Sequence, residues 1–383
     1  MLQQFITSAP HFALSAIAAV AGLFIVICVH EFGHFWVARR CGVQIETFSI
    51  GFGKEIFGWT DKHGTRWKVS WLPLGGYVKM FGDANPASMP GDGVKTMTDD
   101  EKRVAFFHQS IGKRMAVVVA GPAFNYFFAI IVMALFFTFQ GQPYTTPDVS
   151  SVIEDSAAAA VGIKTGDHIV SVDGRPIERF EDIIGVVAMN SGTPVSMEIL
   201  RNNEPIKLMV TPKITVVTDR FGGQQKIGRI GITSDTSKTR KLTPIQSVRQ
   251  AAVESWNLTV GTVKAIGQII MGTRSASELQ GPASILGMLG HAGHDGFVSW
   301  IHLVAFISVN LGFVNLLPIP LLDGGHLAFY TYEKLFGRPL NERVQEMGMR
   351  IGMAMILSLM LFVTWNDLSH FGFFIHFRDW LFS

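Results

Sequence analysis

His30, Glu31 and His34 stand within five consecutive residues, in the order His-Glu-Phe-Gly-His. Residues four positions apart lie on the same face of a helix, so both imidazoles can reach one metal ion. Glu31 is not required as a ligand. It lies beside the ion, where it can take a proton from water and later give it to the leaving amine. Catalytic zinc favours nitrogen ligands and usually has three protein ligands plus water, so the spacing predicts a zinc site that needs one more ligand.

The setting of these three residues favours a functional role. They lie in a largely apolar segment, residues 12–38, that is followed by Arg39 and Arg40. A membrane span needs roughly 20 largely apolar residues. Ionisable side chains inside such a span are costly and are usually functional. A polar helix face that lines a channel or binds a proton is the alternative that these residues alone leave open.

A third ligand is expected from the far end of the sequence. The apolar segment at residues 300–322 contains Pro318 and Pro320 near its end and is followed by Asp323, Gly324 and Gly325. Taken alone, Asp-Gly-Gly after a helix indicates a turn. Because the two histidines require a partner, we expect Asp323 at the end of this broken helix to be the third metal ligand.

The composition indicates a membrane protein. Hydrophobic residues make up 48% and charged residues 16% of the 383 residues, whereas about a quarter of the residues in a soluble domain are charged. A net charge of +2 gives no basis for nucleic-acid binding. Besides the first segment, residues 115–139, 300–322 and 351–365 predict membrane helices. The last of these is short and requires tilt or a thinner bilayer.

Positive charges predict how the chain crosses the membrane, because cytoplasmic loops carry an excess of Lys and Arg. The loop between the first two helices contains Arg39, Arg40, Lys102, Arg103, Lys113 and Arg114, and the loop between the last two contains Lys334, Arg338, Arg343 and Arg350. Both loops are therefore expected in the cytoplasm. The two termini and the long stretch from residue 140 to 299 are expected outside, which puts the metal site near the inner face.

Three regions outside the spans have recognisable patterns. Residues 67–80 predict a β-hairpin that dips into the membrane beside the site, or equally a small interfacial sheet. Residues 144–232 contain short β-branched runs between turn residues, which predicts a β-rich domain large enough to bury its own core. Residues 245–271 predict an amphipathic helix on the membrane surface.

The sequence thus predicts a polytopic α-helical membrane protein with about four transmembrane helices, an inserted β-rich domain and a membrane-associated β-hairpin. We expect residues 1–139 to form the first half of the membrane core and residues 299–383 the second half. Between them we expect the β-rich domain at residues 140–240 and an amphipathic helix with its linker at residues 241–298, both on the outer face.

Two motifs together resemble the site-2 protease family of intramembrane zinc metalloproteases. They are the His-Glu-x-x-His pattern at 30–34 and the pattern Asn315-x-x-Pro318-x-Pro320-x-x-Asp323-Gly324. Shorter matches are Gly-Pro-Ala-Phe-Asn at 121–125, Gly-Gly-Tyr-Val at 75–78 and Gly-Pro at 281–282, and residues 160–169 resemble the entry to a PDZ domain. The resemblance covers nearly the whole chain. It is strongest to the bacterial branch that includes the regulator of sigma-E protease, with one PDZ-like domain here in place of two.

The resemblance implies regulated intramembrane proteolysis with one zinc ion, held by His30, His34 and Asp323, and with Glu31 as the catalytic residue. The substrate would be a single-span protein of the bacterial inner membrane, such as an anti-sigma factor that another protease has already trimmed. Its helix must unwind, because helical hydrogen bonds shield the scissile carbonyl, and the hairpin could capture it by strand addition. The PDZ-like domain would exclude bulky ectodomains or bind a newly formed C-terminus.

The resemblance also implies residues that hold the substrate backbone. These are Asn315 and Asn125, together with Gly75, Gly76 and Tyr77 of the hairpin. Judged from the residues alone, either asparagine could instead cap or bridge helices.

Other histidines and other function classes compete with this interpretation. His291 and His294 predict a hydrated polar loop rather than a second metal site. His326 is either a group that supports the ligands or a surface residue, and His302 is expected beyond the reach of the metal. A membrane-anchored PDZ scaffold with a structural metal would not need Glu31, and a metal or proton transporter usually has more spans with charges along a path.

Overall fold

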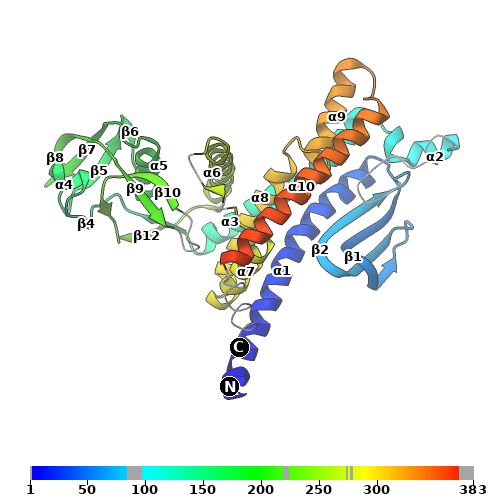
Figure 1. The fold of residues 1–383 in the computed structure, drawn as a ribbon, viewed down its shortest axis with the longest axis horizontal. Coiled ribbons are helices and arrows are strands. Elements are labelled where there is room, and N and C mark those ends of the chain that lie inside the picture. Colours follow the sequence, from blue (N-terminus) through cyan, green and yellow to red (C-terminus); the bar gives the residue numbers. More distant parts are fainter. Residues whose placement is uncertain (1, 84–96, 219–223, 273–274, 277–278, 371–383) are drawn as a thin grey trace. The chain divides into compact units, whose positions relative to one another are not determined.

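The structure is a computed structural model that describes residues 2–83, 97–218, 224–272, 275–276 and 279–370 (Figure 1). The chain forms two compact units. The first contains Met1–Met133, Gln250–Thr262 and Gln280–Ser383, and the second contains Ala134–Arg249 and Val263–Leu279.

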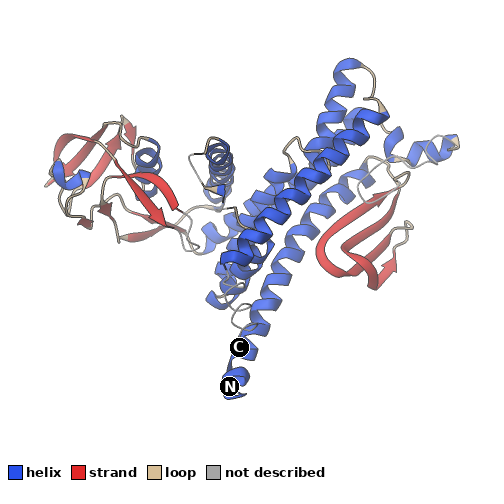
Figure 2. Ribbon diagram, viewed as in Figure 1, coloured by secondary structure: helices blue, strands red, loops and turns tan. Residues whose placement is uncertain are grey.

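Helices dominate the first unit (Figure 2). They are α1 (Leu2–Arg40), α2 (Asp99–Val104), a 3₁₀ turn (Phe106–His108), α3 (Ile111–Phe139), α6 (Pro244–Ile270), α7 (Pro282–Asp295), α8 (Phe297–Asn315), α9 (Asp323–Phe336) and α10 (Glu342–His370), of which α3 and α6 also extend into the second unit. Within the described part of the chain, four stretches are long and apolar enough to cross a membrane: Ala13–Arg40, Ile111–Phe139, Phe297–Asn315 and Arg343–Leu368. They match the four expected segments, and the fourth is longer than the sequence predicted.

The third of these helices ends earlier than predicted. Helix α8 stops at Asn315, and Asp323 is the first residue of α9 rather than the last residue of the preceding span. Pro318 and Pro320 have no backbone N–H to donate, so the helix cannot continue through them. Leu321 has a positive φ of 84°, a conformation that costs a bulky residue about 1–2 kcal/mol. The chain therefore leaves the helix after Asn315 and forms turns before Asp323.

Small residues bring the helices of the first unit close together around α1. A β-carbon on Gly33 would lie 2.4 Å from the carbonyl oxygen of Ala120 in α3. Where α7 packs against α1, a β-carbon on Gly293 of α7 would lie 2.5 Å from Cβ of Ala18 in α1. Such residues allow close approach of helix backbones in membranes, where van der Waals packing drives association. Helix α1, which carries the His-Glu-x-x-His pattern, is thus packed against several neighbours.

Strands β1 (Ile45–Thr60) and β2 (Arg66–Met80) form a sheet that lies beside α1 (Figure 1). Both strands bend, so residues 47–50 pair with residues 76–79 on one side and with 66–69 on the other. Residues 55–60 pair with 66–70, which leaves residues 76–80 as an outer row among the described residues. The predicted hairpin within residues 67–80 is therefore wrong, because the two halves of this segment pair with β1 and not with each other. The Gly75-Gly76 pair lies within β2, and the turn lies at residues 61–65, where Gly64 has a φ of 86°.

Asp61 anchors this turn to the end of α1. Its carboxylate accepts hydrogen bonds from Arg39 Nη2 at 3.0 Å and from Trp67 Nε1 at 3.2 Å. The backbone N–H groups of His63 and Thr65 donate to the same carboxylate at 2.9 and 3.0 Å. Partial burial raises the pKa of Asp61, but these hydrogen bonds outweigh it and hold the pKa below the usual range. The sheet is consequently fixed to the helix that carries the histidines.

Helix α9 is anchored at its C-terminal half. Arg114 of α3 donates to Glu333 Oε1 at 2.6 Å, and its guanidinium lies 4.7 Å from the ring centroid of Tyr330. Burial raises the pKa of Tyr330 to about 12, although Arg114 works in the opposite direction. Because Asp323 is the first residue of α9, this contact also fixes where that carboxylate lies.

The second unit has the expected β-rich character. Its elements are β3 (Gln142–Thr145), β4 (Ser151–Val152), α4 (Ala157–Ala160), β5 (His168–Val172), β6 (Arg175–Pro176), α5 (Phe180–Met189), β7 (Val195–Arg201), β8 (Glu204–Val210), β9 (Lys213–Thr218), β10 (Gln224–Arg229), β11 (Ile232–Thr233) and β12 (Ser237–Arg240). Strands β6, β5, β7 and β8 form one sheet in that order. Ile169, Met197 and Ile199 of this sheet are fully buried in a core that also includes Ile183 of α5.

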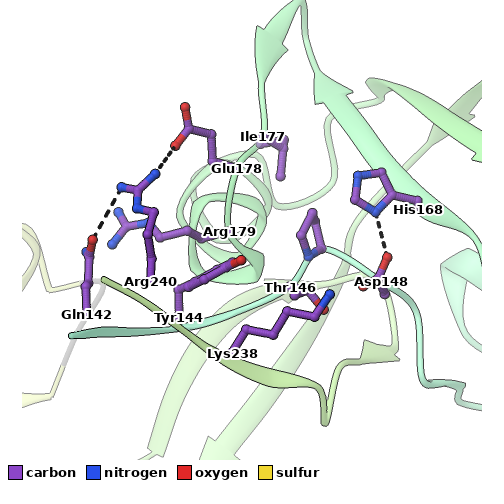
Figure 3. Close-up of a pocket in the computed structure, with 11 residues that line it drawn as sticks. Gln142, Tyr144, Thr146, Asp148, His168, Ile177, Glu178, Arg179, Lys238 and Arg240 are labelled. Atoms are coloured by element: carbon purple, nitrogen blue, oxygen red, sulfur yellow. Dashed lines mark hydrogen bonds and ion pairs between the residues drawn. The ribbon is translucent and has the colours of Figure 1, made fainter. Parts of the chain in front are cut away.

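A pocket of about 470 Å³ opens in the second unit beside β3 and β12 (Figure 3). Several of its charged groups pair with one another. His168 Nδ1 lies 2.6 Å from Asp148 Oδ1, and Arg240 lies 3.5 Å from Glu178 Oε2 and donates to Gln142 (Figure 3). Because positive and negative groups line the pocket and pair internally, its charge does not define one class of ligand.

Asp367 joins the last helix to α7. Its buried carboxylate accepts hydrogen bonds from the backbone N–H groups of Gly281, Ala283 and Ser284, each at 3.1 Å. The Ser284 hydroxyl also donates, at 2.6 Å. Gly281 has no side chain to cap the helix, so Asp367 takes that role from another element, and its negative charge suits the positive end of the helix dipole.

Replacing Asp367 with Ala should lower the melting temperature of the purified protein in detergent. Buried N–H groups left without an acceptor cost about 1–3 kcal/mol. Asp367→Asn retains one acceptor oxygen and should lose less. Leu361→Ala, at a position of α10 that is 73% exposed, is the control and should change little. Equal melting temperatures for Asp367→Ala and the wild type would contradict this role.

Candidate metal centre

Two histidines and one aspartate converge on a single point. His30 Nε2 lies 3.2 Å from His34 Nε2, and Asp323 Oδ2 lies 3.2 Å from the first and 3.5 Å from the second. All three side chains are buried or nearly so. Among the described residues, these three side chains form the group whose potential ligand atoms all lie within 4.8 Å of one another.

The spacing fits a tetrahedral metal ion. Zinc binds nitrogen and carboxylate oxygen at about 2.0–2.2 Å, and the edge of a tetrahedron with such bonds is about 3.3–3.6 Å. The observed separations of 3.2–3.5 Å agree with that edge. Asp323 Oδ2 is also fully buried and accepts no hydrogen bond. A buried carboxylate oxygen in this state requires a cation, so the three residues fit a zinc site with a fourth position left for water.

Helix α1 presents the two imidazoles and a glycine of α3 makes room for them. The rings of His30 and His34 meet edge to face with centroids 4.8 Å apart. A β-carbon on Gly121 would lie 2.2 Å from His34 Nε2 and 2.9 Å from His30 Cε1. Any side chain at this position would therefore occupy the space beside the ligand atoms.

The remaining nitrogen of each imidazole faces α3. His34 Nδ1 lies 2.9 Å from the carbonyl oxygen of Val117, and His30 Nδ1 lies 3.3 Å from the side-chain amide of Asn125. Metal-ligating histidines usually donate their other N–H to such a group, which sets the orientation of the ring. Asn125 is fully buried and faces the Nδ1 side of the His30 ring. Asn315 lies on the opposite side of the same ring, with its Nδ2 3.4 Å from Nε2, the nitrogen that faces the metal.

The Glu31 side chain of α1 lies against the outer row of the β1–β2 sheet. A β-carbon on Gly76 would lie 2.8 Å from Glu31 Cγ and 2.9 Å from the carbonyl oxygen of Ser49. The absence of a side chain at Gly76 therefore lets strand β2 approach the carboxylate. Glu31 follows His30 directly in the helix, which leaves the carboxylate beside the metal ligands and next to a strand.

The sequence-predicted residues divide into two groups. The structure brings His30, His34, Asp323, Asn315 and Asn125 together, with Glu31 and Gly76 beside them. Gly75 and Tyr77 lie on the other face of β2, as expected for residues that alternate along a strand. A β-carbon on Gly75 would lie 2.2 Å from Phe52, and the Tyr77 ring stacks on the Phe52 ring with centroids 6.1 Å apart.

Two groups that support the histidine ligands were not predicted from the sequence. The Val117 carbonyl is a backbone group, so no residue type identifies it. Gly121 belongs to the Gly-Pro-Ala-Phe-Asn motif, but only the contact between α1 and α3 gives it the function of leaving space for the imidazoles. Pro122 lies inside α3 and cannot donate a backbone hydrogen bond to the carbonyl of Val118, the residue after Val117.

The other histidines among the described residues lie outside the metal group. His291 and His294 belong to helix α7, so the prediction of a hydrated loop is wrong; the chain between residues 282 and 295 has no helix-breaking proline beyond the first position. His294 contacts the Ser15 hydroxyl at 2.7 Å. His326 lies one turn after Asp323, with its ring near those of Phe329 and Tyr330.

Known proteins resemble this chain over most of its length. The profile of peptidase family M50 matches residues 18–359. A protein of Agrobacterium fabrum named as a zinc metalloprotease is 42% identical over 352 residues, covering 91% of this chain and 93% of that protein. The regulator of sigma-E protease RseP of Salmonella typhimurium is 31% identical over 448 residues, covering 92% and 98% respectively.

The PDZ domain of an SdrC-like protein from Listeria innocua, a solved structure, is 25% identical and covers 24% of this chain and 94% of its own, with a TM-score of 0.19. The matched residues 18–359 span all three converging side chains, and the relatives align along nearly their whole length. The motifs at both ends of the chain thus predicted the family correctly, and the chain belongs to peptidase family M50, the site-2 protease family.

Proposed function

We propose that this protein is an intramembrane zinc metalloprotease that hydrolyses peptide bonds within the transmembrane segments of single-span membrane proteins. The observation that carries the proposal is the convergence of His30, His34 and Asp323 at metal-ligand spacing, with Glu31 beside them. The helix that supplies three of these four residues is long and apolar enough to span a membrane. Membership of family M50 supports the same reaction class.

The chemistry divides between the ion and the side chains. One zinc ion, when bound, supplies a Lewis acid that activates water and polarises the scissile carbonyl. Glu31 takes the proton that the attacking water loses and passes it to the amide nitrogen, so the C–N bond breaks and a neutral amine leaves. The Asn315 amide is a donor close to the ligands and is suited to bind a carbonyl of the substrate.

Strand β2 is suited to hold an unwound substrate. Residues 76–80 form the outer row of the sheet, and Gly76 at its start lies against Glu31. An extended peptide that pairs with this row would have its backbone fixed beside the catalytic carboxylate. Strand addition also supplies backbone hydrogen bonds in place of those that the substrate helix loses.

The proposed location is the inner membrane of a bacterium. The loops with excess Lys and Arg are assigned to the cytoplasm, and both termini and the β-rich, PDZ-like unit to the outer side. Ile56, Phe57 and Trp71 of the β1–β2 sheet are more than 60% exposed, which supports contact of this sheet with lipid. A membrane-bound anti-sigma factor is the proposed substrate, because one relative is named as a regulator of sigma-E protease. The PDZ-like unit would act as a filter for substrates with large ectodomains.

Glu31→Gln should abolish cleavage of a model transmembrane substrate while zinc stays bound. Glutamine keeps the size of the side chain but cannot take up a proton, and the ligands are untouched. Cleavage in proteoliposomes and metal analysis of the same preparation measure both effects. If the protein were a scaffold with a structural metal, the wild type itself would not cleave the substrate. Full cleavage by Glu31→Gln would contradict the mechanism.

Asp323→Asn should lower the zinc content of the purified protein. The amide oxygen is a neutral and weaker ligand than the carboxylate, so about a tenfold or greater loss of affinity is expected. Asp295→Asn, a carboxylate outside the metal group, is the matched control. Unchanged zinc content in Asp323→Asn would mean that the third ligand lies elsewhere.

Gly76→Ala should reduce kcat/KM for the transmembrane substrate by about tenfold or more, with zinc content unchanged. A β-carbon at this position collides with Glu31 and with the Ser49 carbonyl, and displacement of a catalytic group by about 1 Å can cost that much. Gly112→Ala, where a β-carbon meets nothing within 4 Å, is the control. Wild-type kinetics for Gly76→Ala would show that the strand need not approach Glu31.

A further inference from the structure

Helix α3 supports both imidazoles of the metal centre from behind. It contacts His34 Nδ1 through the Val117 carbonyl at 2.9 Å and His30 Nδ1 through the Asn125 amide at 3.3 Å. The close contact of Gly33 with the Ala120 carbonyl lies between these two points. The same helix pair therefore positions both rings.

Metal binding sets the proton on each ring. An imidazole that binds a metal through Nε2 carries its remaining proton on Nδ1, and that N–H needs an acceptor when it is buried. The Val117 carbonyl is such an acceptor for His34. For His30, the corresponding acceptor must come from Asn125, because its amide is the group found at hydrogen-bonding distance from Nδ1.

The Asn125 amide has an unused oxygen. The side chain is 0% exposed, Nδ2 faces His30 Nδ1, and Oδ1 is buried without a hydrogen-bond partner. When His30 carries its proton on Nδ1, that N–H would face the N–H of Asn125 Nδ2, so two donors would meet. Asn125 Oδ1, an acceptor, would stay unpaired. A half-turn of the amide exchanges its two ends and pairs Oδ1 with the His30 N–H.

We propose that Asn125 is a positioning residue whose amide oxygen accepts the Nδ1–H of His30 and so directs the Nε2 lone pair to the metal. This inference rests on the proposed zinc function and deepens it. It replaces the substrate-binding role that the family resemblance implied for Asn125. The Ser308 hydroxyl of α8 donates to the backbone carbonyl of Asn125 at 3.0 Å, which holds this part of α3 against α8.

The test is the zinc affinity of the full-length protein, measured by competition with a chromogenic chelator. Asn125→Leu removes the acceptor at similar size and should weaken zinc binding roughly 10- to 100-fold. Asn125→Asp supplies a carboxylate oxygen to the same N–H and should bind zinc at least as tightly as the wild type. Asn310→Leu is the control, because Asn310 of α8 bonds to Thr262 instead and should leave the affinity unchanged.

A second readout separates positioning from general damage to the fold. The metal-free forms of Asn125→Leu and the wild type should unfold at similar temperatures. The cobalt-substituted Asn125→Asp protein should retain the absorption spectrum of a tetrahedral site. If Asn125→Leu does not fold, the Asn125→Asp comparison decides, and a tenfold or greater loss of affinity in that variant overturns the proposal.

The outcomes also distinguish this inference from the proposed function. A raised KM in Asn125→Leu with wild-type zinc affinity would favour substrate binding and overturn the positioning role alone. A wild-type protein that binds no zinc through His30, His34 and Asp323 would overturn both.

Discussion

Three electron-rich atoms held within 3.5 Å of one another are the constraint on which this structure depends. The two imidazole nitrogens and the Asp323 oxygen repel each other, and burial removes the water that would screen them. A divalent cation reverses the sign of that interaction. The protein must therefore bring two distant parts of the chain together and hold them rigidly enough that the ligand atoms keep tetrahedral spacing.

Close backbone contact provides the rigidity. Lipid is as apolar as the helix surfaces, so helices in a membrane gain from packing at short range rather than from hiding apolar side chains. Gly33 brings α1 against α3, and Gly121 leaves room for the imidazoles at the same contact. On the other side, a β-carbon on Gly324 would lie 2.2 Å from the Leu317 carbonyl oxygen, so the turn before α9 closes tightly. The ligands are thus carried on elements that have little freedom to move apart.

Polar contacts away from the site fix the same elements. The Arg114–Glu333 pair ties α9 to α3, Asp61 ties the sheet to α1, and Asp367 ties α10 to the start of α7. The Arg114–Glu333 pair and the Asp367 carboxylate are buried or nearly so and have few alternative partners, which makes these contacts costly to break. Catalysis gains from this because a nucleophilic water, a base and a peptide bond react only when held in a narrow geometry.

Local periodicity was enough to predict part of this protein. His30 and His34 share a helix face by their spacing, and the apolar segments predict four helices by length and composition, as the structure bears out. The motifs also indicated the family, because the His-Glu-x-x-His pattern at 30–34 and the pattern from Asn315 to Gly324 occur together in one chain. The β-rich character of the second unit followed from short β-branched runs between turn residues.

Tertiary structure alone decided the rest. It placed Asp323 at the start of α9 instead of the end of a span, and it put the Gly75-Gly76 pair inside a strand whose partner, residues 45–60, had not been predicted. It also set Gly76 against Glu31 and a carbonyl of α3 against His34. These are contacts between residues far apart in sequence. Local rules determine which side chains share a face, whereas packing between elements determines what each face meets.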